Sequence, residues 1–84
     1  MSRIIVERTF PEPFSDAELQ ATMERMGPCL KIYNVTWLRS CLSTDRRRMV
    51  CEYDAADAES VRAVQREANA RFDKAWTAEV LAPE

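Results

Sequence analysis

The spacing of hydrophobic and polar residues along the chain predicts four strands and two helices. Alternation with a period of two marks the strands, whereas a period near 3.6 behind a capping residue marks the helices. The strands are expected at residues 3–9, 35–43, 48–53 and 74–81, and the helices begin after Ser15 and Asp57. The predicted order is therefore strand-helix-strand-strand-helix-strand.

The first helix has clear signals at its start and in its interior. Ser15 and Glu18 have the spacing of a capping box, in which each residue satisfies a free polar group of the other. Gly27 and Pro28 predict a break in the helix, followed by a short continuation. Asn34 can adopt the left-handed conformation that ends such a segment.

This order of elements is that of the ferredoxin-like α+β fold, a βαββαβ arrangement in which two helices cover one face of a four-stranded antiparallel sheet. The length of 84 residues fits one domain, residues 1–84. Strand parity predicts that the helix-covered face carries Ile4, Val6, Leu38, Leu42, Met49, Cys51, Tyr53, Trp76, Ala78 and Val80. The other face is then expected to carry Ile5, Glu7, Thr9, Trp37, Arg39, Cys41, Val50, Glu52, Thr77 and Glu79.

The face without helices would expose large apolar side chains among charged ones. Ile5, Trp37 and Val50 would form an apolar patch, and such patches are usually covered by a partner. A second copy of the chain, placed sheet to sheet, would cover this patch. The pattern therefore predicts a homodimer of the dimeric α+β barrel type.

The composition excludes several kinds of chemistry. The chain has no histidine, which excludes Ser-His-Asp and Cys-His catalysis and removes the commonest metal ligand. Its three cysteines are widely separated and include no CxxC pair, so we expect small buried side chains rather than disulfides or a zinc site. A single glycine leaves no glycine-rich phosphate loop. We predict no metal site and no cofactor.

Charge and hydropathy argue against nucleic acid and membrane partners. Twelve basic and 14 acidic residues nearly balance, and no apolar run approaches the length of a membrane span, so a cytoplasmic location is expected. The basic run at residues 46–48 is interpreted as a solvated hairpin turn. RNA-binding domains of this topology stack bases on aromatic residues of the third strand, where this chain has Glu52.

Three polar side chains are expected to meet on the face without helices. Glu7, Arg39 and Glu52 project from adjacent strands, with Trp37 beside them. In a dimer cavity this set could bind a polar ligand or a hard cation, or take part in proton transfer. The alternative is a network of ion pairs at an interface or in water, which is common on sheet faces.

Three stretches of the chain resemble a family of short bacterial proteins of unknown function that includes a nickel-binding protein. They are ERTFPEP near the start, WLRSCLSTDRRRMVCEYDAADAESVR at residues 37–62, and RFDKAWTAEV near the end. The resemblance covers nearly the whole chain and implies a ferredoxin-like fold and a dimer. The nickel-binding relative depends on histidines in a segment similar to VQREANA at residues 64–70, where this chain has Gln65 and Asn69. Nickel binding is therefore not carried over to this chain.

Three functions remain open from the sequence. The favoured one is a small dimeric protein that binds a small polar or metal-bound ligand beside Glu7, Trp37, Arg39 and Glu52. The second is a cofactor-independent enzyme of the dimeric α+β barrel type, which rests on analogy of fold. The third is a structural or partner-binding module.

Overall fold

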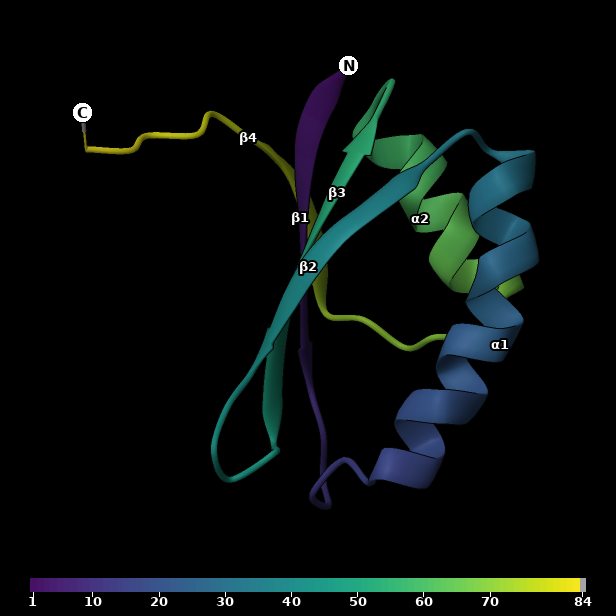
Figure 1. Ribbon diagram of the computed structural model, residues 1–84, viewed down its shortest axis with the longest axis vertical. Helices are drawn as coiled ribbons and strands as arrows, with labels where there is room; N and C mark the ends of the chain where they lie inside the picture. The colour runs from purple at the N-terminus through teal and green to yellow at the C-terminus, as the bar shows by residue number, and fades with distance from the viewer. Residues whose placement is uncertain (84) are drawn as a thin grey trace.

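The six elements follow one another in the predicted order in the computed structural model, which describes residues 1–83. They are β1 (Ser2–Thr9), α1 (Asp16–Ile32), β2 (Thr36–Leu42), β3 (Arg48–Ala55), α2 (Ala58–Glu67) and β4 (Lys74–Ala78). The strands form one sheet in the order β2-β3-β1-β4, and all neighbours are antiparallel. Both helices lie on the same side of this sheet (Figure 1), so the predicted ferredoxin-like α+β fold is confirmed.

Both helices begin at the predicted capping residues. The Oγ atom of Ser15 accepts a hydrogen bond from the backbone N–H of Glu18 at 3.1 Å, and Oδ1 of Asp57 accepts from that of Ser60 at 2.8 Å. Asn34, just after α1, has the expected positive φ of 54°. Within residues 1–83, neither helix is long and apolar enough to cross a lipid bilayer.

The predicted break at Gly27 and Pro28 is wrong. α1 is one helix from Asp16 to Ile32, with Pro28 in its interior. A proline there removes one backbone hydrogen bond. Met26 and Leu30, on either side of Pro28, both pack against the hydrophobic core, and this packing keeps the two halves of the helix in line.

The core lies between the helices and one face of the sheet. The side chains from the strands that fill it include the predicted Ile4, Val6, Met49, Cys51 and Tyr53. The opposite face, which we call the open face, carries no helix (Figure 1). The parity prediction is therefore confirmed for β1 and β3.

A β-bulge in β2 reverses the predicted face of two residues. Trp37 pairs with Tyr53 and Arg39 pairs with Glu52, so Leu38 is an extra residue in the strand. Trp37 therefore lies on the helix side of the sheet, and its predicted place on the open face is wrong. Leu38 was predicted to lie beneath the helices, but it is 43% exposed.

The faces of β4 are also the reverse of those predicted. Trp76 pairs with Ile5 and Thr77 pairs with Ile4, so Trp76 and Ala78 lie on the open face and Thr77 lies on the helix side. Both alternating sets of residues 74–81 contain apolar side chains, so the pattern alone does not distinguish the two faces. β4 also ends three residues before its predicted end.

Two arginines of the hairpin turn bind the segment that leads into α1. The guanidinium of Arg46 forms an ion pair with Asp16 at 2.8 Å and donates to the carbonyl oxygen of Phe14. Arg47 donates to the carbonyl oxygen of Pro11 at 2.8 Å. The predicted solvated hairpin turn is confirmed, since Arg47 and Arg48 are exposed, and Arg46 and Arg47 in addition supply donors to carbonyl groups of the neighbouring segment.

Candidate functional site

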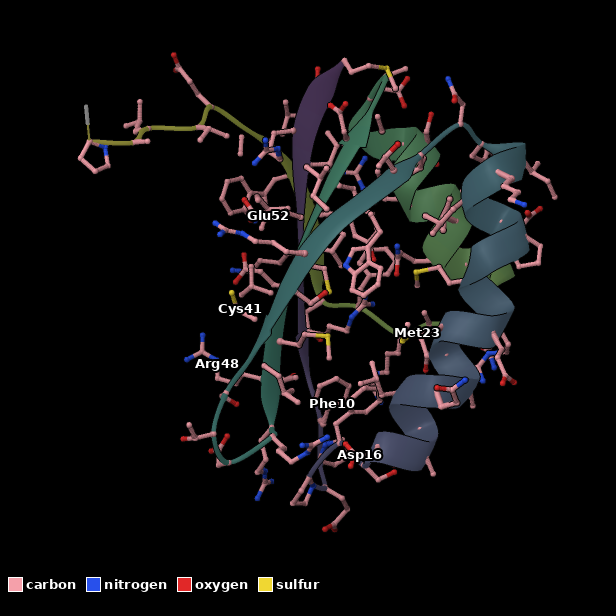
Figure 2. The ribbon with its side chains drawn as sticks, in the orientation of Figure 1. Phe10, Asp16, Met23, Cys41, Arg48 and Glu52 are labelled. Carbon is pink, nitrogen blue, oxygen red and sulfur yellow. The ribbon has the colours of Figure 1, made fainter. Side chains whose placement is uncertain are left out.

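Three of the four predicted site residues lie on the open face. In the pairing of β1 with β3, Ile5 lies opposite Glu52 and Glu7 lies opposite Val50, which places the two carboxylates diagonally across neighbouring strands. Arg39 on β2 pairs with Glu52. Figure 2 shows Glu52, Cys41 and Arg48 projecting from the sheet away from the helices.

Glu52 is held between two arginines. Oε1 accepts from Nη1 of Arg3 at 3.3 Å, and Oε2 pairs with Nε of Arg39. The hydrogen bond from Arg39 is the main cause that holds the pKa of the Glu52 carboxyl below its usual value. The Glu52 side chain is only 15% exposed, whereas that of Arg39 is 72% exposed. Glu52 is thus an ionised carboxylate whose two oxygens already have partners.

Glu7 has a partner of its own. Its Oε2 atom accepts a hydrogen bond from the indole N–H of Trp76 at 2.8 Å. The predicted set therefore consists of two separate arrangements, the Arg3–Glu52–Arg39 cluster and the Glu7–Trp76 pair. A pocket of about 200 Å³ includes Glu7 but neither Arg39 nor Glu52.

Trp37, the fourth predicted residue, lines a larger cavity on the helix side of the sheet. This cavity has a volume of about 420 Å³ and lies between α1 and the sheet. Figure 2 shows Met23 projecting from α1 toward the sheet, and Phe10 lies below it near the sheet end. The apolar side chains of the wall are Phe10, Phe14, Leu19, Met23, Met26, Leu30, Trp37 and Met49.

A buried arginine forms the polar end of the cavity. Arg8 on β1 is only 6% exposed, although it lies on the helix side opposite Met49. Its guanidinium donates to the carbonyl oxygen of Arg71 at 3.1 Å, to Oε1 of Gln65 at 2.9 Å and to the hydroxyl of Tyr53 at 3.3 Å. All of these acceptors are neutral. Within residues 1–83, no carboxylate lies within ion-pair distance of Arg8.

A chain of hydrogen bonds runs from Trp37 through Ser40 to Cys51, whose sulfur also accepts from Arg8. The indole N–H of Trp37 donates to Oγ of Ser40 at 2.9 Å, and Ser40 donates to the sulfur of Cys51 at 3.0 Å. The Tyr53 hydroxyl donates to the sulfur of Met26 at 3.5 Å. Burial raises the pKa of Tyr53 to about 12, so this side chain is neutral at physiological pH.

The remaining charged residues of the cavity wall are mainly basic. Arg25 on α1 and Arg71 after α2 line it, and Glu18 contributes the one carboxylate. Arg25 donates to the carbonyl oxygen of Ala68 at 2.8 Å, which ties α1 to the end of α2. Together with Arg8, the wall therefore carries three guanidinium groups and one carboxylate.

The fold and the cavity define a small ferredoxin-like α+β protein with a pocket between its first helix and the sheet. The chain belongs to the family described as nickel responsive protein SCO4226-like, whose model matches residues 5–77. The crystal structure of SCO4226 from Streptomyces coelicolor A3(2) is similar to it, with a TM-score of 0.84 over 96% of this chain and 100% of that chain. The sequence identity of 15% makes this a likeness of fold. A comparison with curated proteins gave no match.

The side chains of this chain do not fit a nickel site. Nickel is bound well by imidazole, and this chain has no histidine. Within residues 1–83, no three side chains of cysteine, aspartate and glutamate gather where they could hold a metal ion.

Proposed function

We propose that this chain is a small-molecule-binding protein whose site is the cavity between α1 and the sheet. The observation that carries this proposal is the cavity itself, with a volume of about 420 Å³ and predominantly apolar walls. Ligand pockets usually have volumes of roughly 300–1,000 Å³ and few polar groups, which fix the orientation of the ligand. Here Arg8 and Tyr53 at one end supply such groups.

This proposal moves the ligand from the open face to the helix side of the sheet. On the open face, Glu52 is already engaged by Arg3 and Arg39, and Glu7 is engaged by Trp76. A ligand there would have to replace these contacts. In the cavity, a ligand would instead gain contacts with side chains that have no neighbour on one side.

Binding is favoured over acid–base catalysis by the properties of the titratable groups at the polar end. A general acid or base works best when its pKa lies near the operating pH. The pKa of Tyr53 is raised to about 12 by burial, and an arginine side chain stays charged in proteins. Neither group can exchange a proton readily at neutral pH.

The proposal includes a homodimer formed through the open face. Val50 and Trp76 are 38% and 45% exposed on this face, and their apolar surfaces would be covered by a second copy. Charges of both signs lie around this patch. Arg39 on β2 is largely exposed, and Asp54 lies near the end of β3. The ligand site is complete within one copy of the chain, so binding does not depend on this dimer.

A pair of neighbouring substitutions on α1 tests the ligand site. Met23 lines the cavity, whereas Glu24, the next residue, is exposed and does not line it. A neutral apolar dye such as N-phenyl-1-naphthylamine, whose fluorescence rises in apolar surroundings, reports occupancy of the cavity. We expect the dye to bind the native chain and Glu24→Trp alike, and Met23→Trp to weaken binding at least about tenfold by filling the space.

Two outcomes would contradict the proposal. The first is the absence of dye binding by the native chain at concentrations up to the solubility of the dye. The second is equal binding by Met23→Trp and Glu24→Trp, which would place the bound dye outside the cavity.

A further inference from the structure

We propose that the cavity binds an apolar monocarboxylic acid, whose carboxylate pairs with the guanidinium of Arg8 and whose hydrocarbon body lies against α1. This inference rests on the proposed function, because it names the class of ligand for the same cavity. It is carried by the burial of Arg8, by the neutrality of its partners and by the apolar wall.

Arg8 carries a buried positive charge. Burying an ionised side chain costs free energy unless an opposite charge or a full set of hydrogen bonds compensates it. Arg8 is only 6% exposed, and its hydrogen bonds go to a backbone carbonyl, an amide oxygen, a hydroxyl and a sulfur. No carboxylate is among these groups, so a carboxylate in the cavity would supply an opposite charge.

The protein partners of Arg8 are distributed unevenly over the nitrogens of its guanidinium group. A guanidinium group presents a planar fork of N–H donors that matches the two oxygens of a carboxylate. The three protein side chains bonded to Arg8, those of Cys51, Tyr53 and Gln65, all bond to one terminal nitrogen, Nη2. The other terminal nitrogen, Nη1, bonds only to the backbone oxygen of Arg71. The lateral fork of the guanidinium is formed by Nε and Nη2, and Nη2 is already engaged. Among the described residues Nε of Arg8 has no acceptor, so one oxygen of a carboxylate can accept from the Nε–H.

The rest of the cavity wall is mainly apolar. Phe10 and Phe14 stack with their ring centres 4.4 Å apart, and both line the cavity together with methionine and leucine side chains from α1. Such a wall favours a hydrocarbon body over a polyhydroxylated or multiply charged one. The ligand is therefore amphipathic, with one anionic end.

The other charged residues of the wall determine whether an acid, a neutral alcohol or an amine binds best. Arg25 and Arg71 add two positive charges to the wall, and Glu18 adds one negative charge. The resulting positive field attracts anions and repels cations. Together with the charge of Arg8, this field favours the binding of an acid most, that of an alcohol next and that of an amine least.

The experiment compares three ligands with the same chain length. Decanoic acid, decanol and decylamine are titrated into the protein by displacement of N-phenyl-1-naphthylamine, at a pH where the acid and the amine are both ionised. We expect decanoic acid to bind the native chain at least about tenfold more tightly than decanol, with decylamine weakest.

Two variants connect this preference to Arg8. Arg8→Gln removes the charge, and Gln65→Glu keeps Arg8 but adds a carboxylate where Oε1 of Gln65 now accepts from it at 2.9 Å. In either variant the ratio of acid affinity to alcohol affinity should fall at least about fivefold, because only the field of Arg25 and Arg71 remains, while the affinity for decanol stays within about twofold of the native value. Gln65→Glu makes the test independent of whether Arg8→Gln folds.

The outcomes separate this inference from the proposed function. Equal affinity of the native chain for acid and alcohol, or an unchanged preference in both variants, would overturn the carboxylate inference and leave the cavity as a ligand site. Displacement of the dye by none of the three ligands would also overturn the inference. Failure of the dye itself to bind the native chain would overturn both.

Discussion

Arg8 on β1 and Gln65 on α2 are joined by a hydrogen bond in the interior, from Nη2 to Oε1 at 2.9 Å. The two residues lie 57 positions apart in the chain, and Gln65 is fully buried. The other end of the same amide, Nε2 of Gln65, has no hydrogen-bond partner among the described residues. The amide thus stabilises the charge of Arg8 at the expense of one unsatisfied donor.

Replacing this glutamine should destabilise the protein. Gln65→Met keeps the volume but removes a hydrogen bond to a charged group, and we expect the free energy of unfolding to fall by about 1.5–3 kcal/mol. Urea denaturation followed by circular dichroism measures this change. Gln20→Met, the same substitution at an exposed position of α1, serves as the control and should change the free energy of unfolding by less than about 0.5 kcal/mol. Similar values for the two variants would show that the buried amide contributes nothing specific.

The lowered pKa of Glu52 predicts part of the acid sensitivity of the fold. Because the folded chain holds this carboxyl more ionised than the unfolded chain does, Glu52 stabilises the fold above its unfolded pKa of about 4.5, and this contribution is lost as the pH falls through the folded pKa. Glu52→Gln should therefore lower Tm at neutral pH and show a smaller further decrease toward about pH 3 than the native chain. Differential scanning calorimetry across this range gives both values. Glu12→Gln, at an exposed residue, should keep the native slope, and parallel slopes for the native chain and Glu52→Gln would contradict the prediction.

Gly27 in the interior of α1 offers a stabilising substitution. Apart from its two chain neighbours and the backbone of its own helix, a Cβ atom added there would meet no heavy atom within 4 Å, and no glycine in the described chain has a positive φ. Gly27→Ala should raise the free energy of unfolding by less than about 0.5 kcal/mol, because alanine loses less conformational freedom on folding but its Cβ meets the ring of Pro28, the next residue. Ala17→Gly, at an exposed position of the same helix, should lower it by a similar amount. A decrease with Gly27→Ala in urea denaturation would mean that the contact between the new Cβ and the ring of Pro28 outweighs this gain.

The two arginines of the hairpin turn that bind the segment before α1 should matter more than the third. Arg46→Ala removes the ion pair with Asp16 and the hydrogen bond to Phe14, and we expect a loss of about 1 kcal/mol in the free energy of unfolding. Arg48→Ala removes an exposed arginine of the same run and should cost less than about 0.5 kcal/mol. Thermal denaturation of both variants measures the two losses. Equal losses would indicate that the three arginines of residues 46–48 act through their charge alone.

The proposed dimer predicts a change of mass on substitution of one open-face residue. Val50→Glu places a charge in the exposed apolar patch and should convert a dimer into a monomer, as measured by light scattering after size-exclusion chromatography. Thr44→Glu, in the exposed turn between β2 and β3, should leave the mass unchanged. A native chain that is already monomeric at micromolar concentration would remove the dimer from the proposal.

The fold could be predicted because its local signals agree with one another. The capping residues Ser15 and Asp57 and the alternation in β1 and β3 each depend on neighbours within a few positions, and the structure confirms all of them. The faces of β2 and β4 depend on register with a distant strand. The hydrophobic pattern therefore could not predict the extra residue at Leu38. It also could not predict which of the two apolar sets of β4 faces the helices.

The cavity was missed although the sequence contains a signal for it. Arg8 follows Ile4 and Val6 at the same parity, so a charged residue continues the buried side of β1. Glu7 and Glu52, on the other side of the sheet, form the more conspicuous polar set in the sequence. The volume beneath α1 could not be predicted, because it depends on how the helix lies across the sheet and on the reversed face of Trp37.

The position of β1 in the sheet has a consequence for the synthesis of the protein. β1 leaves the ribosome first, but its two neighbours are β3 and β4, since Ile5 pairs with Glu52 on one side and with Trp76 on the other. Until those residues emerge, both edges of an apolar strand remain unpaired, and such edges readily pair with other chains. We therefore expect the nascent chain to depend on its helices for early compactness and to close the centre of its sheet only after β4 has emerged.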